Sequence, residues 1–151
     1  MIVYRITHLK WAGMLTPSGM PARWNSKGKF MLYTAESRAL ACLENLVHRR
    51  SIGPDELYRV TTIDIPKEVS IATLSTADLP TNWQEYTQYA SCQAIGDAWL
   101  SASQSAVLKV PSAIIPEEHN YVINVLHPDM KFIQIKRVEP FSFDFRLTSN
   151  Y

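Results

Sequence analysis

The 151-residue sequence predicts a single domain, residues 1–151, of the α+β class with about six strands and two main helices. A chain of this length supports one hydrophobic core. Apolar residues make up 46% of it and charged residues 19%, which is typical of a packed globular domain. The expected strands and helices do not alternate strictly. This order favours α+β over a doubly wound parallel sheet.

The first third of the chain predicts two strands separated by a long loop. Residues 2–6 are rich in β-branched and aromatic side chains, which indicates a buried strand. Residues 12–28 contain glycine, proline and serine and predict a loop, and long loops in compact domains often carry function. Residues 29–33 predict the second strand.

A helix is expected to follow the second strand and to run to about His48. Thr34 is a suitable N-cap, and Glu36 would lie in the first turn, where the helix dipole favours a negative charge. His48, Arg49 and Arg50 would place positive charge at the C-terminal end, so His48 is interpreted as a residue that offsets the dipole.

The rest of the chain predicts four more strands and the second helix, with residues 68–90 mostly irregular. The expected strands are residues 57–65, which show a phase change, 106–110, 131–138 and 141–147; the expected helix is 91–103. The last strand has the clearest alternation, with Phe141, Phe143, Phe145 and Leu147 on one side.

The charge balance excludes a general electrostatic attraction to nucleic acids or membranes. Fifteen basic and 14 acidic residues give a formal net charge of +1. The N-terminus has neither the pattern of a signal peptide nor that of a membrane span. Cys42 and Cys92 lack metal-ligand spacing and fit a cytoplasmic setting.

Widely used catalytic motifs are absent from the sequence. It contains no phosphate-binding loop, no dinucleotide-binding glycine pattern, no nucleophile elbow and no zinc signature, so no metal is expected. The remaining candidates are polar residues at strand ends and in loops, and composition alone does not mark any of them as catalytic. They are Arg5, Arg23, Tyr33, Glu44, Ser112, Asn120, Asn124 and His127.

Short segments along nearly the whole chain resemble the RES-domain family, which is named for an arginine, a glutamate and a serine. The matching segments are Tyr4-Arg5-Ile6, Arg23-Trp24-Asn25, Tyr33, Leu43-Glu44, Gly96-Asp97-Ala98-Trp99-Leu100, Val110-Pro111-Ser112-Ala113, Asn120 to Asn124, His127-Pro128-Asp129 and Phe143-Asp144-Phe145-Arg146-Leu147. One departure is visible: Pro21-Ala22 stands where the family often has glycines before its Arg-Trp-Asn segment, which affects the expected loop conformation.

The resemblance implies an ADP-ribosyltransferase-like fold and a toxin of a toxin–antitoxin pair. Such toxins deplete NAD⁺ by hydrolysis or phosphorolysis, and some have been described as ADP-ribosylating a protein. NAD⁺ would be a substrate, so no cofactor is expected. The implied partner is an Xre-type helix-turn-helix antitoxin, usually in an oligomeric complex that reaches DNA only through the antitoxin.

This chemistry assigns roles to the matching residues. Cleavage of the nicotinamide–ribose bond produces an oxocarbenium-like ribose, which the carboxylate of Glu44 would stabilise. Tyr33 would form an aromatic wall against the nicotinamide ring. Arg5 and Arg23 would bind the pyrophosphate.

Three further residues complete the expected site. Ser112 would hydrogen-bond the substrate or position Glu44, and a nucleophilic role is disfavoured because no partner set accompanies it. Asn25 and Asn120 are expected to contact NAD⁺.

Each assignment also has a structural alternative. Glu44 could be a surface carboxylate or the partner of a buried Arg5, Tyr33 could belong to the core, and Ser112 could be a turn residue. His127-Pro128-Asp129 favours a turn over an acid–base site. At the level of function, the alternatives are a protein-modifying ADP-ribosyltransferase, an inactive antitoxin-binding module and a toxin that cuts RNA, the last disfavoured by the charge balance.

Overall fold

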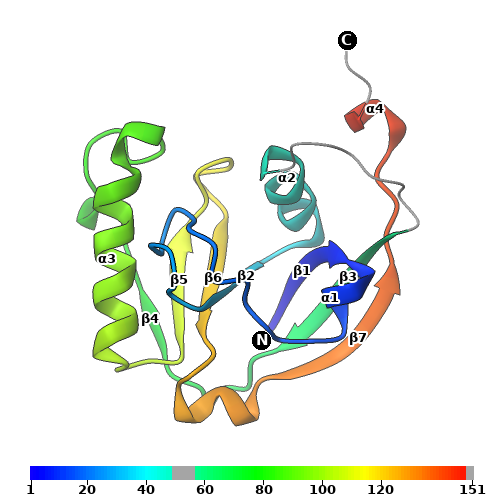
Figure 1. Ribbon diagram of the computed structural model, residues 1–151, viewed down its shortest axis with the longest axis horizontal. Coiled ribbons are helices and arrows are strands. Elements are labelled where there is room, and N and C mark those ends of the chain that lie inside the picture. Colours follow the sequence, from blue (N-terminus) through cyan, green and yellow to red (C-terminus); the bar gives the residue numbers. More distant parts are fainter. Residues whose placement is uncertain (49–56, 149–151) are drawn as a thin grey trace.

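A computed structural model describes residues 1–48 and 57–148 and shows one sheet flanked by helices (Figure 1). The strands are β1 Ile2–His8, β2 Met31–Ala35, β3 Tyr58–Asp64, β4 Ile71–Thr73, β5 Val107–Pro111, β6 His119–Asn124 and β7 Gln134–Pro140, in the order β4-β5-β6-β2-β1-β3-β7. The helices are α1 Leu9–Ala12, α2 Arg38–His48, α3 Tyr89–Ala102 and α4 Phe145–Thr148, with 3₁₀ turns η2 Thr76–Asp78, η3 Tyr86–Gln88 and η4 Pro128–Phe132. The predicted α+β class is confirmed.

The sheet opens in its middle, between β1 and β2. These strands are paired through one residue pair, Tyr4 with Ala35, whereas β1 pairs with β3 along its whole length. The two halves, β4-β5-β6-β2 and β1-β3-β7, therefore diverge from this junction, as the ribbon shows (Figure 1). The divergence leaves space beside the strands for a cleft.

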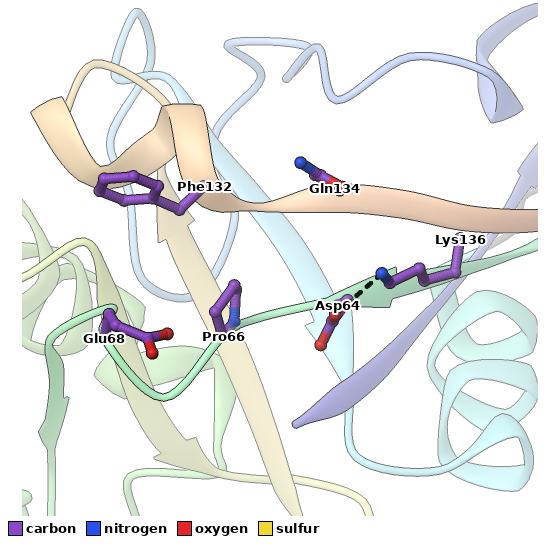
Figure 2. Close-up of a pocket in the computed structure, with 6 residues that line it drawn as sticks. All are labelled: Asp64, Pro66, Glu68, Phe132, Gln134 and Lys136. Carbon is purple, nitrogen blue, oxygen red and sulfur yellow. Dashed lines mark ion pairs between the residues drawn. The ribbon is translucent and has the colours of Figure 1, made fainter.

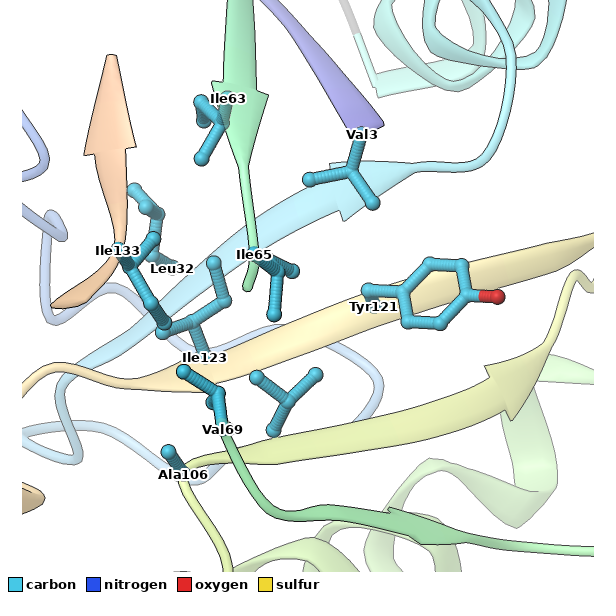
Figure 3. Close-up of a cluster of buried hydrophobic side chains, with 10 residues drawn as sticks. Val3, Leu32, Ile63, Ile65, Val69, Ala106, Tyr121, Ile123 and Ile133 are labelled. Carbon is cyan, nitrogen blue, oxygen red and sulfur yellow. The ribbon is translucent and has the colours of Figure 1, made fainter. Parts of the chain in front are cut away.

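A hydrophobic cluster fills the space between the two halves on one side of the sheet. Val3 of β1 and Ile63 of β3 meet Leu32 of β2 and Ile123 of β6, and all four are at most 1% exposed (Figure 3). Because both halves contribute to this cluster, its burial holds their relative orientation.

The two main helices pack on the other side of the sheet. In α2, Leu40 and Ala41 pack against Ile6 of β1 and Val60 of β3. In α3, Cys92 belongs to a separate cluster that includes residues of β5 and β6. Helix α2 thus covers β1 and β3 and also contacts β2, whereas α3 covers the side of the sheet that contains β5 and β6 (Figure 1).

The long loop after α1 is fastened to α3. The α3 residues Gln93 and Asp97 bind it: the Gln93 amide donates to the Ala22 carbonyl at 2.8 Å, and Asp97 accepts from the backbone and hydroxyl of Ser26. Between them lies Gly96, where a Cβ atom would come within 1.9 Å of the carbonyl oxygen of Trp24. The loop therefore lies directly on the helix backbone.

Pro21-Ala22 is compatible with a tight turn in this loop. The Ala22 N–H donates to the Asn25 carbonyl at 3.0 Å, and Pro21 precedes this bond without taking part in it. The loop conformation that the departure from the family pattern put in question is therefore a closed turn.

Most predicted elements are confirmed, with shifted ends. The strands expected at 2–6, 29–33, 57–65 and 106–110 correspond to β1, β2, β3 and β5, and the helices expected to about His48 and at 91–103 correspond to α2 and α3. The phase change in β3 coincides with a register shift between Thr62 and Ile63. The strand expected at 131–138 is η4 followed by β7. Arg49 and Arg50 lie outside the described residues.

The strand predicted at 141–147 is wrong. The chain follows β3 only as far as Phe141, whose N–H donates to the Tyr58 carbonyl at 3.0 Å, and residues 141–144 form no strand. The rings of Phe141 and Phe143 instead pack edge to face beside α2, with their centroids 4.9 Å apart. Phe145 and Leu147 lie in α4 and are 73% and 52% exposed. The alternating apolar residues of 141–147 therefore lie in an irregular segment and a short helix, not in a strand.

The predicted helix cap at Thr34 is also wrong. Thr34 is buried in β2, where its hydroxyl donates to the Tyr121 carbonyl at 2.8 Å. The hydroxyl of Ser37 caps α2 by accepting from the Leu40 N–H at 3.0 Å, so Glu36 precedes the helix. None of the helices in the described residues is long and apolar enough to cross a bilayer.

Candidate active site

A cleft of about 860 Å³ occupies the space where β1 and β2 diverge. Strands β1 and β2 line one side of it, and α2, the loop of residues 18–24, the start of α3, the end of β5 with residues 113–114, and Asn120 of β6 line the rest. Five of the seven predicted site residues line this cleft: Arg5, Arg23, Tyr33, Glu44 and Asn120. Residues far apart in the sequence are thus brought to one place.

Glu44 lies on the cleft side of α2, held by two donors from the neighbouring strands. Its Oε1 accepts from the Ser112 hydroxyl at 3.0 Å and from the Asn120 amide at 2.5 Å. Ser112 is fully buried behind the cleft at the end of β5, whereas the Glu44 side chain retains 23% exposure. The predicted positioning of Glu44 by Ser112 is present in the geometry, and Asn120 serves the same carboxylate.

The carboxylate of Glu44 is held in its ionised form. Burial alone would raise its pKa, but the nearby His48 imidazole and the hydrogen bonds from the two neutral donors outweigh burial and lower the pKa below its ordinary value. Glu44 therefore presents a negative charge to the cleft over the whole neutral range.

His48 follows Glu44 by one helical turn and contacts its other oxygen. The His48 Nε2 lies 3.6 Å from Glu44 Oε2. Its side chain is 62% exposed and lines the cleft. The sequence predicts that His48 offsets the helix dipole, and its contact with Glu44 is additional to that prediction.

Tyr33 reaches from β2 into the cleft and anchors the long loop. Its hydroxyl donates to Asn25 Oδ1 at 2.7 Å and accepts from the Trp24 N–H at 3.2 Å. Burial raises the pKa of Tyr33 well above its ordinary range, so the hydroxyl stays protonated. The ring lines the cleft, while the hydroxyl is engaged by the loop.

Asn25 stabilises the loop from within. It is 1% exposed, and its amide lies within hydrogen-bonding distance of three carbonyls of its own loop, those of Met20, Ser26 and Lys29. Asn25 is absent from the cleft lining, unlike the other predicted NAD⁺ contacts. Its observed role is to shape the loop that carries Arg23.

Arg5 projects from β1 with most of its donors available. One guanidinium nitrogen donates to the Met14 carbonyl at 3.3 Å, and burial lowers the pKa of Arg5. Within residues 1–48 and 57–148, Arg5 forms no ion pair with Glu44 or another acid. The alternative of a structural Arg5–Glu44 pair is therefore not observed.

Arg23 has a different environment from Arg5. Its Nη1 donates to the Trp83 carbonyl at 2.6 Å and its Nη2 to the Gln84 carbonyl at 2.8 Å. The guanidinium also lies over the ring of Tyr89, at 4.5 Å from its centroid. Arg23 thus joins the long loop to the segment before α3 at the rim of the cleft.

A second hollow, of about 350 Å³, lies beside η4 and the start of β7 (Figure 2). Two acids line it, Asp64 and Glu68, and Asp64 forms ion pairs with Lys136 at 3.3 Å and with the amino terminus at 3.7 Å. None of the predicted site residues lines this hollow. The larger cleft is therefore the candidate active site.

Comparison with known families identifies the family of this chain. The sequence model of the RES-domain family matches residues 2–145, which is nearly the entire chain. The chain belongs to the RES-domain family. The resemblance inferred from its short segments is thereby confirmed.

The relatives of this RES domain include proteins named as toxins. "Toxin Res" of Photorhabdus laumondii is 38% identical over 157 residues, covering 97% of each chain. The "Prs ADP-ribosylating toxin" of Sphingobium sp. is 36% identical over 146 residues, covering 95% of this chain and 89% of the relative.

A solved structure shares the fold of this RES domain. A chain of the M. tuberculosis MbcT-MbcA toxin-antitoxin complex superposes with a TM-score of 0.75 at 20% identity, covering 93% of this chain and 84% of the other. This likeness shows that the two chains share one α+β fold.

The remaining sequence candidates of the RES domain lie outside the cleft. His127 caps η4 by accepting from the Asp129 N–H at 3.1 Å, which confirms the turn. Asn124 binds its own loop through the Leu126 N–H. Sequence reasoning missed the cleft position of His48 and Tyr89; the spacing of four residues between Glu44 and His48 on one helix was the available signal for the first.

Proposed function

We propose that this RES domain is the toxin of a toxin–antitoxin pair and that it consumes NAD⁺ by breaking the nicotinamide–ribose bond. The observation that carries the proposal is the fixed, ionised Glu44 carboxylate in a cleft that also holds Arg5. A negative charge on one wall matches the positive charge that develops on the ribose during cleavage, and a cation on another wall matches the anionic pyrophosphate.

Glu44 would act by charge and position. As the C1′–N bond lengthens, positive charge develops on the ribose, and a nearby preorganised carboxylate stabilises it. Nicotinamide leaves with the bonding electron pair as a neutral molecule, so the leaving group needs no strong acid. Ser112 and Asn120 would keep the carboxylate in place during this step.

The other cleft residues would bind and orient the dinucleotide. Arg5 has unused donors for the pyrophosphate, and the Tyr33 ring offers an apolar surface for nicotinamide. Both guanidinium ends of Arg23 already bind carbonyls, so its contribution to phosphate binding would be weaker than that of Arg5.

The biological setting follows from the family. We propose an Xre-type helix-turn-helix antitoxin as partner, in an oligomeric complex that contacts DNA through the antitoxin. The cytoplasm, which holds the NAD⁺ pool, is the proposed place of action, and NAD⁺ is the substrate rather than a cofactor.

Nicotinamide release by the purified protein tests this proposal. Chromatography of NAD⁺ incubated with the protein should show nicotinamide with ADP-ribose in plain buffer, or with ADP-ribose 1-phosphate when phosphate is the acceptor. Intact NAD⁺ under both conditions would overturn the proposal. Growth arrest on expression without the antitoxin tests the toxin role separately.

A second candidate keeps the same cleft but changes the acceptor to a protein side chain. The name of the Sphingobium relative, an ADP-ribosylating toxin, favours it. Labelled NAD⁺ added to lysate separates the two: label bound to a protein band supports transfer, and label confined to small products supports hydrolysis or phosphorolysis.

A further inference from the structure

The two oxygens of Glu44 have different surroundings. Oε1 accepts two neutral hydrogen bonds, from Ser112 and Asn120, and is turned toward the strands. Oε2 instead lies 3.6 Å from the Nε2 of His48. Hydrogen bonds thus fix the Oε1 side of the carboxylate, while the Oε2 side faces an imidazole.

His48 lines the cleft at the exposed end of α2. It is the last residue of α2, and its side chain is 62% exposed while also lining the cleft. Solvent therefore reaches the imidazole directly, in contrast to Glu44, whose side chain is 23% exposed.

The cleft offers few other groups that could accept a proton. In the part of the chain that the structure describes, Glu44 and His48 are its only lining carboxylate and imidazole. The other titratable or charged lining residues are Arg5, Arg23, Tyr4, Tyr33 and Tyr89. Arginine is permanently protonated, and the protonated Tyr33 hydroxyl already donates to Asn25.

We propose that His48 accepts the proton of the water that attacks the ribose. This inference rests on the proposed function and adds a residue to it. Water oxygen forms the bond to C1′, the C1′–N bond breaks with its electron pair going to nicotinamide, and one water proton passes to the imidazole and then to solvent. Glu44 meanwhile keeps its charge, which is needed against the ribose cation.

Separate roles for Glu44 and His48 account for the presence of two basic groups one helical turn apart. A carboxylate that took the proton would lose the charge that stabilises the cation. An adjacent imidazole removes this conflict, and its contact with Oε2 orients it, as carboxylates orient imidazoles in other enzymes.

His48→Ala tests the proposal, with His119→Gln as control. His119 also pairs with a glutamate, its Nδ1 lying 3.4 Å from Glu36 Oε2, but this pair is outside the cleft lining. We expect His48→Ala to lower kcat for NAD⁺ hydrolysis about 100-fold, with the calorimetric Kd for NAD⁺ changed by less than about twofold. Added imidazole should restore about tenfold of the loss, because the site is open to solvent.

The outcomes separate this role from the function on which it rests. If the wild-type protein hydrolyses NAD⁺ and the kcat of His48→Ala lies within about twofold of the wild-type kcat, the His48 role alone is overturned. The role is also overturned if His48→Ala loses activity only because it binds NAD⁺ more weakly and added imidazole does not restore the activity. Wild-type turnover that requires phosphate would overturn the role as well, because the phosphate dianion attacks the ribose without a base. A wild-type protein that leaves NAD⁺ intact would overturn the proposed function and the His48 role together.

Discussion

The hydroxyl of Ser112 directs its single proton to Glu44. It donates to Glu44 Oε1 at 3.0 Å and accepts from the N–H groups of Ile114 and Ile115 at 3.1 and 3.2 Å. Because both backbone donors occupy the lone-pair side of the hydroxyl, its proton is left for the carboxylate. This arrangement fits a positioning residue and disfavours a nucleophilic serine.

Asn120→Asp should shift the pH dependence of nicotinamide release to higher pH. The change replaces the amide 2.5 Å from Glu44 Oε1 with a like charge, which favours the protonated form of Glu44 and raises its pKa. We expect the acidic limb of the kcat profile to move up by about one unit. Asn120→Ala, which removes the donor without adding charge, should move it less. An unshifted limb in the aspartate variant would contradict the observed contact.

The contribution of the Glu44 charge to stability should disappear in acid. Hydrogen bonding lowers the folded-state pKa of Glu44 below its ordinary 4.5, so its stabilising contribution is complete above that pH. The contribution is lost as the pH falls through the folded-state pKa. Urea unfolding of wild type and Glu44→Gln from pH 7 to pH 3 should show a difference in free energy of unfolding that narrows below pH 4.5. A difference that grew on acidification would have the wrong sign.

Gly96→Ala should destabilise the protein, although alanine is ordinarily the better helix former. In an open helix position the change would stabilise by about 1 kcal/mol. Here the new Cβ would meet the Trp24 carbonyl at 1.9 Å, so the loop must move away from α3. We expect a loss of about 1–3 kcal/mol in the free energy of unfolding, measured by urea denaturation. Equal or greater stability would show that the loop does not lie on the helix as described.

The two arginines should respond differently to replacement by lysine. Arg5→Lys should weaken NAD⁺ binding about tenfold by calorimetry with little change in Tm, because a free two-pronged donor becomes a point charge. Arg23→Lys should mainly lower Tm, because both its carbonyl contacts cannot be kept. The assignment would be reversed if Arg23→Lys weakened binding more than Arg5→Lys.

Sequence patterns predicted the fold where local signals and tertiary contacts agree. The apolar runs of β1, β2 and β5 and the helix that ends at His48 are such cases. The strand expected at 141–147 is wrong because the alternation of Phe141 and Phe143 reflects only which side chains are buried. Whether the backbone also pairs with a neighbouring strand is set by tertiary structure, which local sequence does not reveal.

The candidate site was predictable as a set of residues but not as a set of contacts. Family resemblance selected Glu44 and Ser112, while their hydrogen bond depends on how β5 approaches α2 across 68 residues of sequence. Asn25 was expected at the substrate and instead binds loop carbonyls, since an asparagine in a loop gives no local indication of which side it faces.

Nicotinamide release by Glu44→Gln compared with wild type tests the central claim most directly. Glutamine keeps the shape and an oxygen that can accept from Ser112 and Asn120, so the change removes chiefly the charge. We predict that kcat falls about 100- to 1000-fold while the calorimetric Kd for NAD⁺ changes little. A Glu44→Gln protein that releases nicotinamide at the wild-type rate would contradict the claim that the Glu44 carboxylate stabilises the ribose cation.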